Sequence, residues 1–108
     1  MAATVIWTND PAKWTKRIEK RVAEAVEETA KEIVNDAKGR APVDTGHLRD
    51  SIAAQRIDEF GQVVAVHASY AAFVEYGTRH MAAQPFFIPA LESAKQPFIQ
   101  RIRKAFEQ

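Results

Sequence analysis

Apolar residues recur at steps of three and four through residues 10–38, which is the spacing of one face of an α-helix. Asp10 followed by Pro11 is typical of a helix start, because aspartate accepts a backbone N–H and proline lacks one. Gly39 follows the last apolar position and is typical of a helix end. The pattern predicts a long helix over 10–38 that buries Trp14, Ile18, Val22, Ala25, Thr29, Ile33 and Ala37, with Val26, Ala30 and Val34 widening the face.

A second helix is predicted over residues 89–107, near the other end of the chain. It follows Pro89, and its apolar positions again have helical spacing. Basic residues near its end interact favourably with the partial negative charge at the C-terminus of a helix. The apolar positions are Leu91, Ala94, Phe98, Ile102 and Phe106, and the basic ones are Arg101, Arg103 and Lys104.

The residues between these helices show turn signals and short strand patterns. A glycine-containing turn at 58–61 divides residues 51–67 into a predicted β-hairpin, with strands over 51–57 and 62–67. Ser69 and Gly77 bracket a predicted short helix over 69–77, as N-cap and terminator. Residues 39–50 are then a turn region and 78–88 a loop, while the N-terminal arm, 1–9, contains a possible apolar strand at 4–7.

These elements predict one α+β domain over residues 1–108, with a long N-terminal helix and a C-terminal helix packed on a small antiparallel β-sheet. Hydrophobic residues make up 46% of the chain and charged residues 27%, which are values of globular proteins. The net charge of +1 argues against a dedicated nucleic-acid-binding protein. The N-terminus lacks the pattern of a signal peptide, and no apolar run could span a membrane, so we expect no membrane partner.

Candidate chemistry is sparse along the chain. There is no cysteine, and three histidines, His47, His67 and His80, lack the spacing of metal ligands. No serine lies in a Gly-x-Ser-x-Gly motif, and the chain has no glycine-rich phosphate loop. We therefore expect no catalytic residue, no cofactor and no metal.

The tripeptide Asp44-Thr45-Gly46 leaves an enzymatic alternative open, since aspartic proteases that dimerise use the same residues. Their chemistry needs two aspartates brought face to face at the ends of buried apolar strands. Here the tripeptide follows a predicted helix and Pro42 instead. The pattern favours a structural turn, formed by Pro42, Asp44, Thr45 and Gly46, in which the polar side chains accept backbone N–H groups.

Two segments are candidates for contact with other proteins. The short helix carries Tyr70, Phe73 and Tyr76, more aromatic surface than a single turn can bury on one side, so we expect part of it to form a subunit interface. The apolar residues of the following loop do not recur with the spacing of a buried helix or strand. Its residues Thr78, Arg79, His80 and Met81 are predicted to form a partner-binding loop that becomes ordered in an assembly.

Charges are sorted along the long helix. Basic residues cluster at its start, which leaves a weak nucleic-acid-binding module as a further alternative, and acidic residues fill its second half, against the preference of the helix dipole. A head-to-tail contact between the basic start of one helix and the acidic half of the next would close a ring. The residues of this hypothesis are Lys16, Arg17, Lys20, Glu24, Glu28 and Glu32.

Three segments in order, residues 41–52, 70–78 and 81–91, resemble the tail-completion or head–tail joining family of tailed bacteriophages. The resemblance covers roughly residues 15–95 and brings no catalytic residue with it. It implies a structural protein of the virion neck or tail, assembled in the host cytoplasm. It further implies a ring, usually a hexamer, that contacts other neck and tail proteins, with DNA only as passing cargo.

Overall fold

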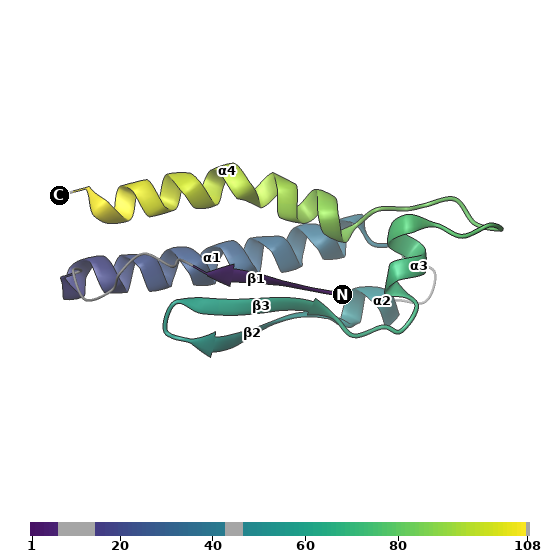
Figure 1. Ribbon diagram of the computed structural model, residues 1–108, viewed down its shortest axis with the longest axis horizontal. Helices are drawn as coiled ribbons and strands as arrows, with labels where there is room; N and C mark the ends of the chain where they lie inside the picture. The colour runs from purple at the N-terminus through teal and green to yellow at the C-terminus, as the bar shows by residue number, and fades with distance from the viewer. Residues whose placement is uncertain (7–14, 43–46, 108) are drawn as a thin grey trace.

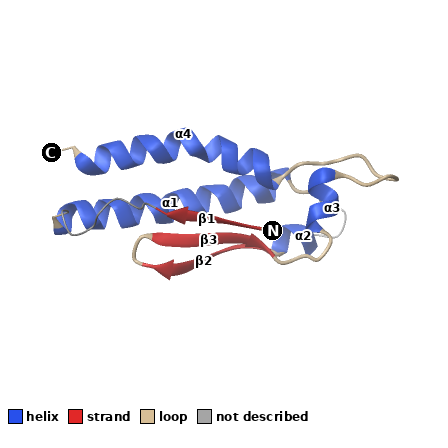
Figure 2. Cartoon of the chain, viewed as in Figure 1, coloured by secondary structure: helices blue, strands red, loops and turns tan. Residues whose placement is uncertain are grey.

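The computed structural model describes residues 1–6, 15–42 and 47–107 and confirms the predicted α+β class (Figures 1 and 2). Three strands form one antiparallel sheet, and two long helices run beside it. The elements in chain order are β1 (Ala2–Ile6), α1 (Lys16–Arg40), α2 (His47–Asp50), β2 (Ile52–Asp58), β3 (Gly61–Val66), α3 (Ala71–Tyr76) and α4 (Phe87–Phe106).

The elements stack in layers, with α4 on α1 and α1 on the sheet, so that α1 lies in the middle (Figure 1). The two long helices are antiparallel, and the molecule is a rod of 53 × 22 × 19 Å. The predicted apolar face of α1 is buried from Val22 to Ala37, and α4 meets it with Ala90, Ala94 and Ile102. Burial of this shared apolar surface is the main source of stability for the helix pair.

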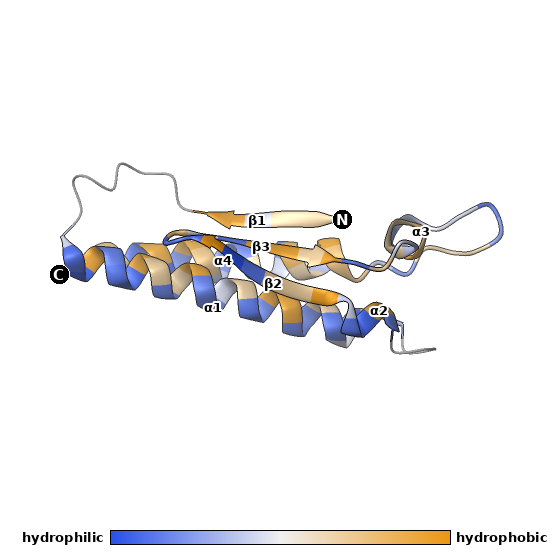
Figure 3. Ribbon diagram, turned by 90° about the horizontal axis from the view of Figure 1, so that it is seen from below, coloured by the Kyte–Doolittle hydropathy of each residue, from blue (hydrophilic) through white to orange (hydrophobic). Residues whose placement is uncertain are grey.

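The sheet has the order β1-β3-β2, so the N-terminal strand pairs with the second strand of the hairpin. Because paired residues of antiparallel strands point to the same side, Val5, Val64 and Ile52 lie on the face that α1 covers, and all three are buried. Glu59 and Phe60 form the hairpin turn, and a bulge between Arg56 and Asp58 displaces Ile57. The opposite face of the sheet is turned away from the helices (Figure 3).

The bounds of α1 differ from the predicted ones. The helix begins at Lys16, after Thr15, whose side-chain oxygen accepts the backbone N–H of Ile18 at 3.3 Å. The predicted start at Asp10 and Pro11 lies outside the described residues. At the other end the helix continues through Gly39 to Arg40, so Gly39 is not its terminator. Among the described glycines only Gly77 has a positive φ.

Further boundaries correct the sequence-based ones. The N-terminal strand covers Ala2–Ile6 and so begins before the predicted range 4–7. The predicted turn region contains the single-turn helix α2, which inserts Leu48 into the core. Tyr70, not Ser69, occupies the N-cap of α3, without a side-chain capping bond, whereas Gly77 ends this helix as predicted. The last helix begins at Phe87 instead of residue 89, because Phe86 and Phe87 are both buried in the core and hold the chain there.

Candidate functional site

An apolar groove at one end of the rod brings together several residues predicted to contact partners. It has a volume of about 730 Å³ and lies between α2, α3 and the loop that follows α3. The rings of His47 and Tyr70 are 6.0 Å apart within it. Its lining residues are Pro42, His47, Leu48, Tyr70, Phe73, Val74, Thr78, Met81 and Gln84. Pro42, the aromatic helix and the loop, which are separate in the sequence, thus contribute to one surface.

Large apolar side chains are exposed around this groove. Phe73 and Tyr76 keep 59% and 65% of their surface accessible, and Met81 keeps 39%. Exposed aromatic and methionine side chains that gather at one place are typical of protein interfaces. Of the predicted interface aromatics, Tyr70 is half-buried, packs against the core and lines the groove. Solvent-exposed apolar surface is therefore present at this end of the molecule.

The orientation of α3 follows from its opposite side. Ala71 and Glu75 are one helical turn apart and are both buried, which turns Phe73 and Tyr76 outward. Glu75 is only 3% exposed, and its Oε1 accepts the backbone N–H groups of Phe86 at 3.3 Å and Phe87 at 2.8 Å. A carboxylate from α3 thus caps the positive N-terminus of α4. Sequence patterns give no sign of this residue, because a glutamate on a short helix is usually solvated.

The loop after α3 projects from the end of the rod (Figure 1) and is closed by backbone hydrogen bonds. Thr78 and Met81 form a β-bridge, in which the Thr78 N–H donates to the Met81 carbonyl at 2.8 Å. The Gln84 N–H donates to the Val74 carbonyl at 2.8 Å. Arg79 and His80 lie exposed at the tip. The predicted partner-binding loop is therefore a tight turn with exposed side chains, and ordering by a partner stays a prediction.

The turn residues of the protease alternative are only partly described. Pro42 is half-buried and lines the groove, whereas Asp44, Thr45 and Gly46 lie outside the described residues. The segment before them is the end of α1, which Ala41 caps by donating to the Ala37 carbonyl at 2.9 Å. An aspartic protease would need a buried strand at this place. The helix found here gives the protease alternative no support.

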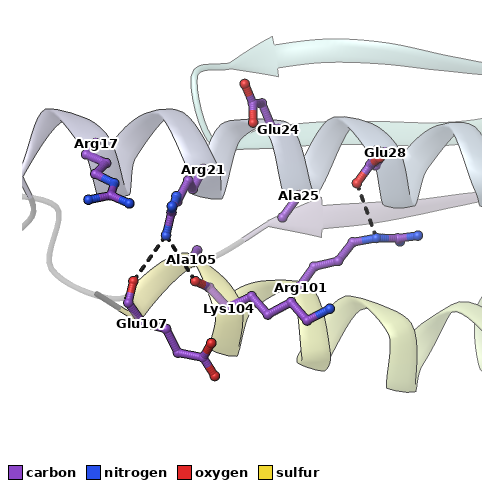
Figure 4. Close-up of a pocket in the computed structure, with 9 residues that line it drawn as sticks. All are labelled: Arg17, Arg21, Glu24, Ala25, Glu28, Arg101, Lys104, Ala105 and Glu107. Atoms are coloured by element: carbon purple, nitrogen blue, oxygen red, sulfur yellow. Dashed lines mark hydrogen bonds and ion pairs between the residues drawn. The ribbon is translucent and has the colours of Figure 1, made fainter.

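Two of the three acidic residues predicted to form the ring contact are paired within the chain instead. Arg101 of α4 forms hydrogen bonds with both carboxylate oxygens of Glu32. Its Nε also lies 3.4 Å from Glu28 Oε2 (Figure 4). This intrachain pairing was not predicted. It leaves Glu24 as the one predicted acidic partner with no ion pair in the described part of the chain.

The basic start of α1 lies beside the end of α4. Arg21 Nη1 donates to the carbonyl oxygens of Lys104 at 3.4 Å and Glu107 at 3.1 Å, and so caps the last turn of α4 (Figure 4). Lys16, Arg17 and Lys20 are exposed and form no ion pair with another described residue. Their role in a ring contact stays a prediction.

The Glu32–Arg101 pair predicts a pH dependence of stability. The hydrogen bonds from Arg101 lower the pKa of Glu32 below its ordinary value. A lowered folded-state pKa adds stability above the ordinary glutamate pKa of about 4.3, and this stability is lost as the pH falls through the lowered value. Glu32→Gln should thus destabilise at pH 7, by less than about 1 kcal/mol because the pair is partly exposed, and this difference should shrink at acidic pH.

Thermal unfolding of both proteins at several pH values measures this effect. Glu27→Gln is the control, because Glu27 forms an exposed ion pair with Lys31, at 3.3 Å on its own helix. A destabilisation by Glu32→Gln that stays constant down to pH 3 would show that the ion pair is not its cause.

The described residues contain neither a cluster of metal ligands nor a helix that could span a membrane. The structure brings no three histidine, aspartate or glutamate side chains of residues 1–6, 15–42 and 47–107 together in a way that could hold a metal ion. No helix in these ranges is sufficiently long and apolar to span a membrane.

Comparison with known protein families matches residues 12–77, more than half of the chain, to the family described as "Bacteriophage HK97-gp10, putative tail-component". Searches of curated proteins and of solved structures returned no match. The matched range holds α1, the sheet hairpin and α3, and it includes the first of the three segments on which the resemblance rests and all but the last residue of the second. The chain belongs to the HK97-gp10-like family of bacteriophage tail components.

Proposed function

We propose that this chain is a structural virion protein of the phage neck, which forms a hexameric ring that joins or completes the head–tail junction. Membership of a tail-component family supports a place in the tail and a role without catalysis. Within this proposal the other partners are neck and tail proteins, DNA is only passing cargo, and assembly takes place in the host cytoplasm.

The apolar groove and its exposed rim carry the proposal of a partner contact. An isolated subunit exposes Phe73, Tyr76 and Met81 beside a groove of about 730 Å³. Burying such side chains stabilises a complex by about 25 cal/mol per Å² of apolar surface. The tip of the rod is therefore suited to insert into, or to receive, an apolar segment of a neighbouring neck or tail protein.

We expect the double substitution Phe73→Asp and Met81→Asp to block joining of heads to tails. Loss of a central apolar anchor costs a protein interface about 2 kcal/mol or more, which weakens binding by about 30-fold. The measurement is complementation of a phage that lacks this gene with the chain supplied from a plasmid. Unjoined heads and tails in electron micrographs, together with a fall in infectious titre, are the expected result.

The matched control is Gln96→Asp with Gln100→Asp, which adds the same two charges at exposed positions of α4, away from the groove. Circular dichroism of both purified variants shows whether they fold. A folded groove variant that restores the titre as well as the parent does would contradict the proposed contact.

A further inference from the structure

The sheet has two free edges, and the backbone shows which groups they present. β3 is the central strand: its end donates from Val66 N–H to the Met1 carbonyl on one side, and from His67 N–H to the Ser51 carbonyl on the other, both at 3.0 Å. Along an edge strand of an antiparallel sheet, the backbone N–H and C=O groups of successive residues point alternately toward the neighbouring strand and away from it. The N–H and C=O groups that point outward are therefore those of Ala2, Thr4 and Ile6 on β1 and those of Ile52, Ala54 and Arg56 on β2.

No described residue forms a backbone hydrogen bond to the outer side of either edge. Proteins that stay monomeric usually protect such edges with charges, proline or bulges. β1 has none of these in its sequence Ala2–Ile6. β2 has charges and a bulge only near its end, at Arg56 and Asp58, which leaves Ile52 to Gln55 unprotected. Both edges are thus competent to pair with another strand.

The outer face of the sheet strengthens this inference. Antiparallel sheets that face water usually carry polar residues on that face. Here Ile6 and Ile57 are 41% and 51% exposed, and the face turned away from α1 (Figure 3) carries no charged residue from β1 or from the paired positions of β3. The uncharged residues of this face are Ala2, Thr4, Ile6, Ala53, Gln55, Ile57, Gly61, Val63 and Ala65, and its one charged residue is Asp58, which pairs with Gly61 at the hairpin end of β2.

An apolar groove of about 320 Å³ runs beside the free edge of β1. β1 forms one wall, α1 contributes Thr29 and Ile33, and α4 contributes Leu91 and Phe98. An extended strand alone can bond to the edge and place every second side chain in this groove. The occupant of the groove is therefore an extended segment with small or apolar side chains on one face.

We propose that the β1 edge of one copy pairs with the β2 edge of the next copy, so that the sheet continues from subunit to subunit. This proposal deepens the proposed ring and rests on it. β1 and β2 are both antiparallel to β3 and so run in the same direction. Copies related by rotation about an axis along the strands keep that direction, and the new strand pair is parallel. Since the two edges differ, the contact is head-to-tail and can close a ring.

The pairing properties of the chain favour a second copy over another protein as the occupant. β2 offers seven residues to the five of β1, and past Ile52 all of its residues are exposed. Each free edge thus finds in another copy an edge of sufficient length with complementary unpaired groups. The alternative ring contact through α1 charges is weakened, because Arg101 already pairs with Glu28 and Glu32 in the same chain.

Proline substitutions at outward positions test this contact. Thr4→Pro removes one outward N–H from β1, and Ala54→Pro removes one from β2, while both leave the bonds to β3 in place. Each variant alone is expected to remain monomeric by native mass spectrometry under conditions in which the parent forms rings. Mixed together, the two variants should form heterodimers and no rings, because each retains one intact and complementary edge.

Thr4→Val and Ala54→Val keep the N–H groups and are expected to form rings. If both proline variants form rings as the parent does, edge pairing is wrong while the ring stands. A parent that stays monomeric at high concentration overturns the ring and this contact together.

Amide exchange gives a measurement that needs no variant. The N–H groups of Thr4 and Ile6 should exchange at least about tenfold more slowly in the ring than in the monomer, and unchanged exchange would overturn the pairing.

Discussion

Glu75→Leu is expected to lower the free energy of unfolding by about 3 kcal/mol, because it leaves the buried N–H groups of Phe86 and Phe87 without an acceptor. A buried donor that loses its partner costs about 1–3 kcal/mol, and here two donors at the positive end of α4 lose the same carboxylate. For a domain of about 100 residues this corresponds to a fall in melting temperature of more than about 10 °C, which calorimetry can measure.

Glu75→Gln is the control for this prediction. The amide oxygen of glutamine can still accept the two bonds, but it lacks the negative charge, so we expect a loss of only about 1 kcal/mol. The order parent, Gln, Leu in melting temperature is the signature of a cap on α4. Equal melting of the Leu variant and the parent would show that Glu75 does not hold the start of this helix.

Gly77→Val should destabilise the protein by about 3 kcal/mol and disrupt the loop beside the groove. Gly77 has φ 78° and ψ 174°, a backbone conformation that is essentially restricted to glycine and costs other residues about 1–3 kcal/mol. A Cβ atom at this position would also lie 2.7 Å from the Ala83 nitrogen and 2.9 Å from the Met81 carbonyl oxygen. Both neighbours are backbone atoms of the loop, so the clash can be relieved only by moving that loop.

Gly39→Ala is the matched control, since Gly39 lies in α1 and an added Cβ would meet nothing within 4 Å. Alanine in an exposed helical position is expected to stabilise by about 0.5–1 kcal/mol. Denaturant unfolding measures both effects. A Gly77→Val variant as stable as the parent would contradict the strained conformation at the end of α3.

The two long helices were predictable because their stability depends on local periodicity. Seven positions of the predicted face of α1 are buried, from Val22 to Ala37, and the apolar positions of α4 are buried or half-buried. Such a pattern identifies the buried face even where the predicted bounds are wrong: α1 begins at Lys16 instead of residue 10, yet its apolar face is the predicted one. The short helix, its glycine terminator and the hairpin were also readable, since turn chemistry acts over a few residues.

The resemblance to a phage tail-component family was equally a property of the sequence, because it rests on short segments in a fixed order. The first of these segments lies within the matched range 12–77, as does the second except for its last residue. The helix α2 was not predicted, because a single turn has too few residues for a period. Its place is set by Leu48, which is 3% exposed and packs in the core.

Only the tertiary structure decided which distant residues meet. The sequence assigned no contact to Glu75 and gave Arg101 only a favourable place at the end of a helix dipole. In the structure Glu75 caps α4, and Arg101 joins Glu28 and Glu32 across the helix pair. The pairing of β1 with β3, and hence the identity of the two free edges, depends on a contact between residues about sixty positions apart. Local sequence determines which segments form helices or strands and which faces are apolar. Their partners follow from which apolar faces can be buried together in one chain, and this is a property of the whole fold.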